Sequence, residues 1–230
     1  MIGIIGAMDE EISQITDKMT GVAVTETAGM TFNRGKLNGR EIVAVRSGIG
    51  KVNAAICTQI LAADFHADHI INTGVAGSLR NEINIGDVVI STDAVQHDMD
   101  ATGFGYKPGV IPRMKISDFP ADERLRKLAV QACREAVPSV GVYEGRIVSG
   151  DQFISDRQVK ERLTKQFDAF CTEMEGAAIA QAAYLNNIPF LIIRAISDKA
   201  DGSAKMDYSE FERRAINNSV ALLTCMIERI

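Results

Sequence analysis

Five short apolar runs rich in Ile and Val constrain the fold of this chain more than any other feature. They are "IGIIG" (2–6), "HIINTGVAG" (69–77), "GDVVISTDAV" (86–95), "GRIVSGD" (145–151) and "PFLIIRAISD" (189–198). Continuous runs of this length are typical of strands that are buried on both faces, and most of them end in Gly, Ser or Asp. Strands buried on both faces occur mainly in parallel sheets that helices cover.

Helical patterns alternate with these strands. Helices are predicted at 51–64, 121–137, 175–187 and 207–230. The last has apolar residues at a spacing of about 3.6, and the third is Ala-rich and small enough to pack closely on a sheet. Three further strand-like stretches at 21–27, 31–39 and 41–48 predict an antiparallel meander. Asn38-Gly39 within them is a strong signal for a tight hairpin turn.

This alternation predicts an α/β fold with a mixed, mostly parallel central sheet flanked by helices. Neither a Pro/Ser/Gly-rich linker nor a block of charge divides the 230 residues. We therefore expect a single domain that spans residues 1–230.

The charge and the cysteines exclude several classes of protein. A net charge of −5 without clustered Lys or Arg argues against a nucleic-acid partner. The longest apolar stretches are too short to span a bilayer, so no membrane association is expected. Four widely spaced cysteines, with no CxxC pair, favour reduced thiols and a cytoplasmic location.

Carboxylates and apolar side chains follow the ends of the predicted strands, where ligands of α/β proteins bind. The acids are Glu11, Glu173, Glu175 and Asp198, and the apolar residues include Met8, Phe153 and Met174. Carboxylates accept hydrogen bonds from hydroxyl groups, and apolar side chains pack on a flat ring. These strand ends predict a site for an aromatic heterocycle and a polyhydroxyl ring, and they suit phosphate poorly.

Each of these residues also has a purely structural explanation. Glu11 can complement the dipole of its helix, as Asp9 and Glu10 in the same turn are expected to do. Arg194 on a buried strand needs an acidic partner, and a structural ion pair would supply one. Asp198 can be a cap of a turn or helix. The predicted site therefore rests on the convergence of three of these acids, Glu11, Glu175 and Asp198, at strand ends.

Six motifs in order carry a resemblance to a known family. They are "GIIGAMDEE", "SGIGKVNAA", "INTGVAG", "VSGDQFI", "EMEGAAIA" and "RAISD", and they span residues 2–198. At these motifs the chain resembles the 5'-methylthioadenosine/S-adenosylhomocysteine nucleosidases, which share the purine nucleoside phosphorylase fold. "YSEF" at 208–211 also resembles the family's closing helix. Six ordered blocks are far more specific than one isolated glycine motif.

The resemblance implies hydrolysis of the N-glycosidic bond between adenine and a 5'-substituted ribose. The expected substrates are 5'-methylthioadenosine, S-adenosylhomocysteine and 5'-deoxyadenosine, without a ranking among them, and the expected setting is methionine salvage and the methyl cycle. Asp198 would be the general acid that protonates adenine N7, with Ser197 orienting its carboxyl. Glu11 would activate the water, with Arg194 in an orienting role. Glu175 would bind the ribose hydroxyls.

The resemblance also implies which residues contact the substrate. Phe153 and Ile154 would border adenine, Met174 would lie against the sugar, and Met8 and Ile49 would line the sugar and the 5' substituent. Val75, Gly77 and Glu173 complete the expected substrate-binding set. Phe104 and Pro112 match residues that the neighbouring subunit donates in this family, which implies a homodimer.

The chain departs from the family pattern at three places. Val75 stands where many relatives have Ser, which removes a hydroxyl from the pocket. Gly176 in "EMEGAAIA" changes the packing of a helix, and Gly103 lies beside the segment around Phe104. These departures bear on substrate preference more than on the type of reaction.

Three other functions compete with hydrolysis. A phosphorylase would need cations for phosphate, and Arg46 and Arg80 are the candidates, although Arg80 is expected to be solvated. A nucleotide-dependent dehydrogenase would need the G-x-G-x-x-G spacing, which "GIIGAMDEE" lacks. A non-catalytic nucleoside-binding protein would not need the three acids. His66 and His69 are too few for a metal site, so no metal and no cofactor are expected.

Overall fold

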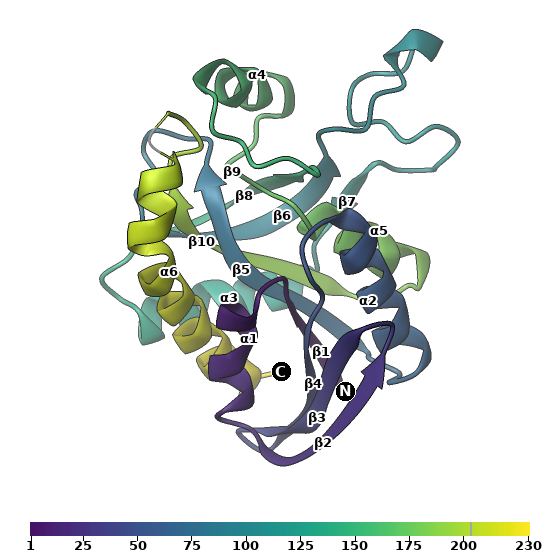
Figure 1. The fold of residues 1–230 in the computed structure, drawn as a ribbon, viewed down its shortest axis with the longest axis vertical. Coiled ribbons are helices and arrows are strands. Elements are labelled where there is room, and N and C mark those ends of the chain that lie inside the picture. Colours follow the sequence, from purple (N-terminus) through teal and green to yellow (C-terminus); the bar gives the residue numbers. More distant parts are fainter. Residues whose placement is uncertain (203) are drawn as a thin grey trace.

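The predicted strands form one mixed sheet with helices on both faces (Figure 1). The computed structural model describes residues 1–202 and 204–230, and within them all side chains except those at 205–210. The strands are β1 Ile2–Gly6, β2 Thr20–Thr27, β3 Met30–Leu37, β4 Arg40–Arg46, β5 His69–Ser78, β6 Val88–Gln96, β7 Asp118–Pro120, β8 Val142–Ser149, β9 Cys171–Glu173 and β10 Phe190–Asp198. The α-helices are α1 Asp9–Thr16, α2 Lys51–Ala63, α3 Glu123–Ala136, α4 Arg157–Phe167, α5 Gly176–Leu185 and α6 Ala204–Ile227, and η1 Thr102–Phe104 is a 3-10 helix.

Part of the sheet closes into a ring. β5 pairs with β10, β10 with β6, β6 with β8, β8 with β9, and β9 returns to β5. β1 joins the first half of β5 in parallel, and β4, β3 and β2 continue the sheet from there. β9 pairs antiparallel with the end of β5, with Gly77 opposite Thr172. This crossing brings the residues after β9 to the edge where β1, β5 and β10 end.

Two apolar layers cover the sheet. α1, α3 and α6 pack on one face, and α2 and α5 pack together on the other (Figure 1). Consecutive residues of β1 enter different layers: Ile4 belongs to the first and Ile5 to the second, and both are fully buried. Because successive side chains of a strand point to opposite faces, a strand between two helix layers needs a continuous apolar run.

Most of the predicted elements are confirmed. The Asn38-Gly39 turn joins β3 to β4 with positive φ at both residues, as a tight hairpin turn requires. α5 buries its small residues against the sheet, as its Ala-rich sequence predicts. α4 and β9 were not predicted. The "YSEF" motif lies on α6, and its first three side chains fall outside the described residues.

The cysteines agree with the expectation of reduced thiols. Cys57, Cys133, Cys171 and Cys225 are all free thiols. Within the part of the chain that the structure describes, none of the helices combines the length and the apolar character needed to cross a bilayer.

Candidate active site

A cavity of about 320 Å³ opens where β1, β4, β5, β8, β9 and β10 end. Its wall consists of Ala7, Met8, Glu11, Ile49, Val75, Ala76, Gly77, Phe153, Thr172, Glu173, Met174, Glu175, Ser197 and Asp198. Glu11, Glu175 and Asp198, the three acids expected to be catalytic, therefore share one cavity with Glu173. Ala76 and Thr172 also line it but have no charge or ring that would have marked them in the sequence.

Glu11 lies deep in the cavity, and backbone donors hold its carboxylate. One oxygen accepts the N–H groups of Ala7 at 2.6 Å and Met8 at 3.1 Å, and the other accepts the Val75 N–H at 3.2 Å. Burial raises the pKa of Glu11 above its ordinary value, although Arg194 and these donors oppose the shift. Val75 thus contributes its backbone N–H to the site.

Arg194 stands behind the wall and balances the acids. Only 1% of it is exposed, and its guanidinium donates to Asn72 Oδ1 and pairs with Glu173. Burial alone would lower the pKa of Arg194, but Glu173, Glu11 and Glu175 raise it above its ordinary value. The structural ion pair considered from the sequence therefore exists, and it lies within the site. A cation so placed fixes the positions of the carboxylates around it.

Gly74 allows this arrangement. A Cβ atom at this position would lie 2.3 Å from Arg194 Nη1 and 2.5 Å from Glu11 Oε1. Only glycine leaves the space that both charged groups occupy.

Glu173 makes several hydrogen bonds inside the protein. Besides Arg194, its carboxylate accepts the Ser149 hydroxyl and the N–H groups of Glu175 at 3.0 Å and Gly176 at 2.8 Å. A Cβ on Gly176 would lie 3.0 Å from Glu173 Oε1, so glycine at this position leaves room for the carboxylate. These contacts favour a supporting role for Glu173, which was predicted as a contact to substrate.

Glu175 caps the cavity from the start of α5. Its Oε1 accepts the N–H of Gly50 at 2.8 Å, and its Oε2 lies 4.0 Å from Arg194. Burial and the neighbouring Glu173 raise the pKa of Glu175 to about 7. A carboxyl with this pKa changes its charge near neutral pH. Gly50 was not among the predicted site residues, because its contribution is a backbone donor.

Asp198 ends β10 and lines the cavity. The Ser197 hydroxyl donates to Asp198 Oδ2 at 3.0 Å, and the Ala200 N–H donates to Oδ1 at 2.7 Å. The register of β10 against β5 shifts between Ile196 and Asp198, which places Asp198 opposite Gly77. Bulges of this kind redirect a side chain at a strand end. The predicted pairing of Ser197 with Asp198 is thus present.

Apolar residues surround these charges. Met8, Val75 and Met174 lie on the wall, while Ile49 and Phe153 are about half exposed, at 56% and 47%. The side chain of Ile154, directly after Phe153, is buried in a small apolar cluster and points its apolar atoms into that cluster rather than forming part of the cavity wall. The wall therefore combines charged groups with apolar surface suited to a flat ring.

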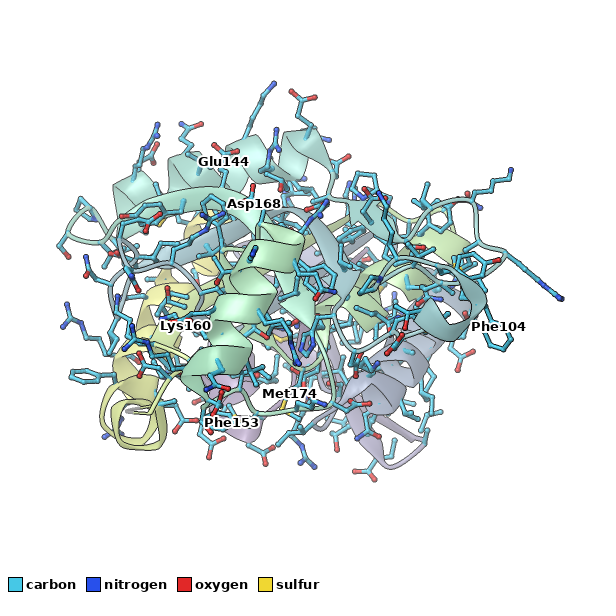
Figure 2. All side chains as sticks on the ribbon, turned by 90° about the horizontal axis from the view of Figure 1, so that it is seen from above. Phe104, Glu144, Phe153, Lys160, Asp168 and Met174 are labelled. Carbon is cyan, nitrogen blue, oxygen red and sulfur yellow. The ribbon has the colours of Figure 1, made fainter. Side chains whose placement is uncertain are left out.

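Phe104 and Pro112 lie apart from this cavity. Phe104 is 86% exposed on η1, and Figure 2 shows it on a different side of the molecule from Phe153 and Met174. Neither residue contributes to the wall formed by its own chain.

The candidate cations for a phosphate pocket are engaged elsewhere. Arg46 pairs with Asp9 at 3.1 Å on the surface. The expectation that Arg80 is solvated is wrong, because its guanidinium pairs with Asp168 and lies 4.9 Å above the ring of Phe170. Neither arginine lines the cavity. Among the described residues, no cluster of His, Cys, Asp or Glu has the arrangement of a metal site.

Comparisons with known proteins agree with this geometry. The sequence model of the phosphorylase superfamily matches residues 1–228. The 5'-methylthioadenosine/S-adenosylhomocysteine nucleosidase of Staphylococcus carnosus (strain TM300) is 46% identical over 231 residues, which cover 100% of both chains. The Neisseria meningitidis nucleosidase of the same name, solved with methylthio-immucillin-A, has a TM-score of 0.96 and 38% identity over 100% of this chain and 99% of that one.

A solved structure with a different name also has this fold. A mutant futalosine hydrolase of Helicobacter pylori strain 26695 matches with a TM-score of 0.94 and 33% identity, over 100% of this chain and 99% of that one. The family match over nearly the whole chain and the identities above 40% are decisive. The chain belongs to the phosphorylase superfamily and, within it, to the 5'-methylthioadenosine/S-adenosylhomocysteine nucleosidases, hydrolases that act on N-glycosyl compounds.

Proposed function

We propose that this protein hydrolyses the N-glycosidic bond of 5'-methylthioadenosine, S-adenosylhomocysteine and 5'-deoxyadenosine, and releases adenine. The observation that carries the proposal is the cavity in which Glu11, Glu175 and Asp198 meet among apolar side chains. Among the described residues, the wall of this cavity has no arginine or lysine, so it offers a dianion of phosphate little attraction. Water is therefore the proposed nucleophile.

Asp198 is the proposed general acid. As the C1'–N9 bond breaks, its electron pair moves into adenine, and the Asp198 carboxyl gives a proton to N7. The hydroxyl of Ser197 and the N–H of Ala200 support this role because they fix the carboxyl at the cavity wall. Phe153 and the backbone of Ile154 are the proposed contacts to the adenine ring.

Glu11 and Glu175 act on the ribose side. Glu11 accepts a proton from the water that attacks C1', and its three backbone donors hold it in place for this task. Glu175 accepts hydrogen bonds from the ribose hydroxyls and stabilises the positive charge that develops on the sugar. Arg194 orients both carboxylates, and Met8, Ile49, Val75, Gly77 and Met174 are the proposed contacts to the sugar and its substituent.

The exposed segment around Phe104 and Pro112 completes the site of a second subunit in this proposal. Phe104 is an apolar side chain in contact with solvent and remote from its own cavity. Placed over the neighbouring cavity in a homodimer, it would cover the apolar 5' substituent. Methionine salvage and the methyl cycle are the proposed setting of the reaction.

A direct assay tests the proposal. Adenine release is measured from the three nucleosides, and from futalosine because a futalosine hydrolase shares the fold, each with and without added phosphate. Hydrolysis at the same rate in both conditions, with free 5'-substituted ribose as product, is the expected result. A requirement for phosphate, or a sugar 1-phosphate as product, would show a phosphorylase instead.

A further inference from the structure

A second charged cluster lies outside the cavity and joins two of its walls. Lys51, the first residue of α2, donates from Nζ to Asp98 Oδ1 at 2.6 Å and to Gln96 Oε1 at 3.0 Å. Asp98 follows the end of β6, and Asp151 follows the end of β8. Lys51, Asp98 and Asp151 are here called the Lys51 clamp, and none of the three lines the cavity.

Each carboxylate of the clamp also binds a backbone donor. Asp151 Oδ1 accepts the N–H of Lys51 at 2.8 Å, and Asp98 Oδ2 accepts the N–H of Asp151 at 3.0 Å. The residue that caps α2 is Gly50, which has no side chain to satisfy the first N–H groups of the helix. Asp151, 100 residues further along the chain, acts as the cap instead, because its carboxylate accepts the N–H of Lys51. The clamp thus ties the start of α2 to the segment after β8.

Both tied segments carry groups of the site. The N–H of Gly50 donates to Glu175 Oε1, and Phe153, two residues after Asp151, lines the cavity. Gly50 has φ of 96°, and a Cβ there would lie 3.2 Å from Asp151 Oδ1. Glycine therefore lets the turn adopt this conformation in close contact with the carboxylate.

The Lys51–Asp98 pair of the clamp is sheltered from solvent, whereas Asp151 is exposed. The side chains of Lys51 and Asp98 are 18% and 17% exposed, much less than those of surface ion pairs such as Lys127–Glu123, at 72% and 68%. Exposed pairs hold no fixed geometry and contribute little, whereas a sheltered pair with further hydrogen bonds has a defined one. The geometry of the clamp is thus suited to fixing the position of a nearby group.

We propose that the Lys51 clamp consists of positioning residues for the nucleosidase reaction: it holds the Gly50 N–H on Glu175 and fixes the Phe153 segment against the same cavity. The inference rests on the proposed role of Glu175. The groups that face Glu175 are Glu173 from β9, Arg194 from β10, Glu11 from α1 and the Gly50 N–H at the start of α2. Of these, the clamp reaches Gly50.

The test compares three variants with the wild-type protein. Lys51→Met removes the charge at the centre of the clamp, Lys51→Arg keeps it, and Lys127→Met removes a matched lysine from a surface pair. We expect Lys51→Met to lower kcat by about 10–100-fold, the loss typical of small displacements at a reacting centre. Lys51→Arg should recover most of this loss, and Lys127→Met should leave kcat unchanged.

The pH profile separates positioning from mere support of the fold. The Gly50 N–H lowers the pKa of Glu175, so its displacement should move the acidic limb of the kcat/KM profile to higher pH. Wild-type kcat and pH profile in folded Lys51→Met would overturn the proposal. So would a loss of activity that follows only the loss of thermal stability, with the limb unmoved.

A measurement without substrate keeps this inference distinct from the proposed function. The Glu175 carboxyl is titrated by ¹³C NMR in the wild-type and Lys51→Met proteins, with Glu175→Gln to assign the signal. A higher pKa in Lys51→Met supports the clamp even if the nucleosides tested are not hydrolysed. An unchanged pKa overturns it, whatever the wild-type enzyme does.

Discussion

Arg194 is the residue that makes a cluster of buried acids tolerable. Three glutamates face its guanidinium, and ionisation of all three would leave a net negative charge in a region shielded from water. Removing one partner of such a buried group typically costs about 3–5 kcal/mol, because the remaining charges lose their compensation. Burial raises the pKa values of Glu11 and Glu175, and Arg194 opposes both shifts, which favours the ionised forms that the proposed reaction requires.

The acid role assigned to Asp198 predicts a loss of turnover. Asp198→Asn keeps the shape of the side chain and can still accept the Ala200 N–H, but it has no proton to give to N7. We expect kcat for adenine release to fall by about 10²–10⁴-fold. Ser197→Ala, which leaves the carboxyl in place, should have a much smaller effect. Full activity in Asp198→Asn would assign the acid elsewhere.

The raised pKa of Glu175 predicts that replacing this residue has opposite effects on stability and on activity. Its pKa is about 7 in the folded protein against an ordinary 4.5, so folding favours the protonated form and stability is lost as pH rises from 4.5 to 7. Glu175→Gln cannot ionise. Its free energy of unfolding should exceed that of the wild type by about 1–3 kcal/mol at pH 8 and approach it at pH 5, although activity is lost.

Urea unfolding at the two pH values measures this difference. A variant that is less stable than the wild type at pH 8 would contradict the prediction, and would mean that the Glu175 carboxylate is stabilised by its neighbours more than it is destabilised by burial.

At the scale of the elements, Gly77 near the end of β5 predicts a steric effect of a larger residue on Asp198. A Cβ on Gly77 would lie 2.7 Å from Asp198 Oδ1 and 2.9 Å from Ala200 Cβ. Gly77→Ala should therefore displace the carboxyl and lower kcat by about 10–100-fold, while overpacking destabilises the fold by about 1–3 kcal/mol. Gly202→Ala is the matched control, because a Cβ there meets no atom within 4 Å. Equal kcat in both variants would show that Asp198 tolerates the extra methyl.

How well the sequence predicts a strand or helix depends on which neighbours bury that element. β1 and β10 lie between two helix layers, so their continuous apolar runs predict them closely. β9 has three residues and exists only because β5 and β8 pair with it. α4 is strongly polar, and its signal was limited to the Asp156 cap and an amphipathic pattern. The closure of the ring depends on pairings between distant strands, which no local pattern specifies.

The same division applies to the site. The acids at the strand ends could be selected because charged residues after buried strands are unusual. The donors that hold them could not, because a backbone N–H has no sequence signature. Gly50 reaches Glu175 across 125 residues, and Asn72 reaches Arg194 across 122. Contacts of this kind follow from the completed fold.

At the scale of the whole molecule, the exposed Phe104 predicts that sites are shared between subunits. Phe104→Ala should raise KM for 5'-methylthioadenosine if the partner donates this ring. Co-expression of Phe104→Ala and Asp198→Asn chains with different tags then gives mixed dimers. In these, one site has both an intact Asp198 and an intact Phe104, so KM should return to the wild-type value at half of the sites.

The mixed dimer distinguishes the two possible arrangements. If Phe104 served its own chain, the only site with an active acid would still lack the ring, and KM would stay high. A monomer in analytical ultracentrifugation would contradict the shared site at once.

The closed ring of β5, β10, β6, β8 and β9 has a consequence for the order of folding. The cavity takes residues from Ala7 to Asp198, and the pairing of β9 with β5 brings Glu173 and Glu175 to it. Pairings between segments far apart in sequence form slowly, because a long loop must close before any contact compensates for it. A nascent chain can thus hold helices and a partial sheet without any catalytic competence. The rate at which adenine release recovers after dilution from denaturant would therefore measure the rate at which this ring of strands closes.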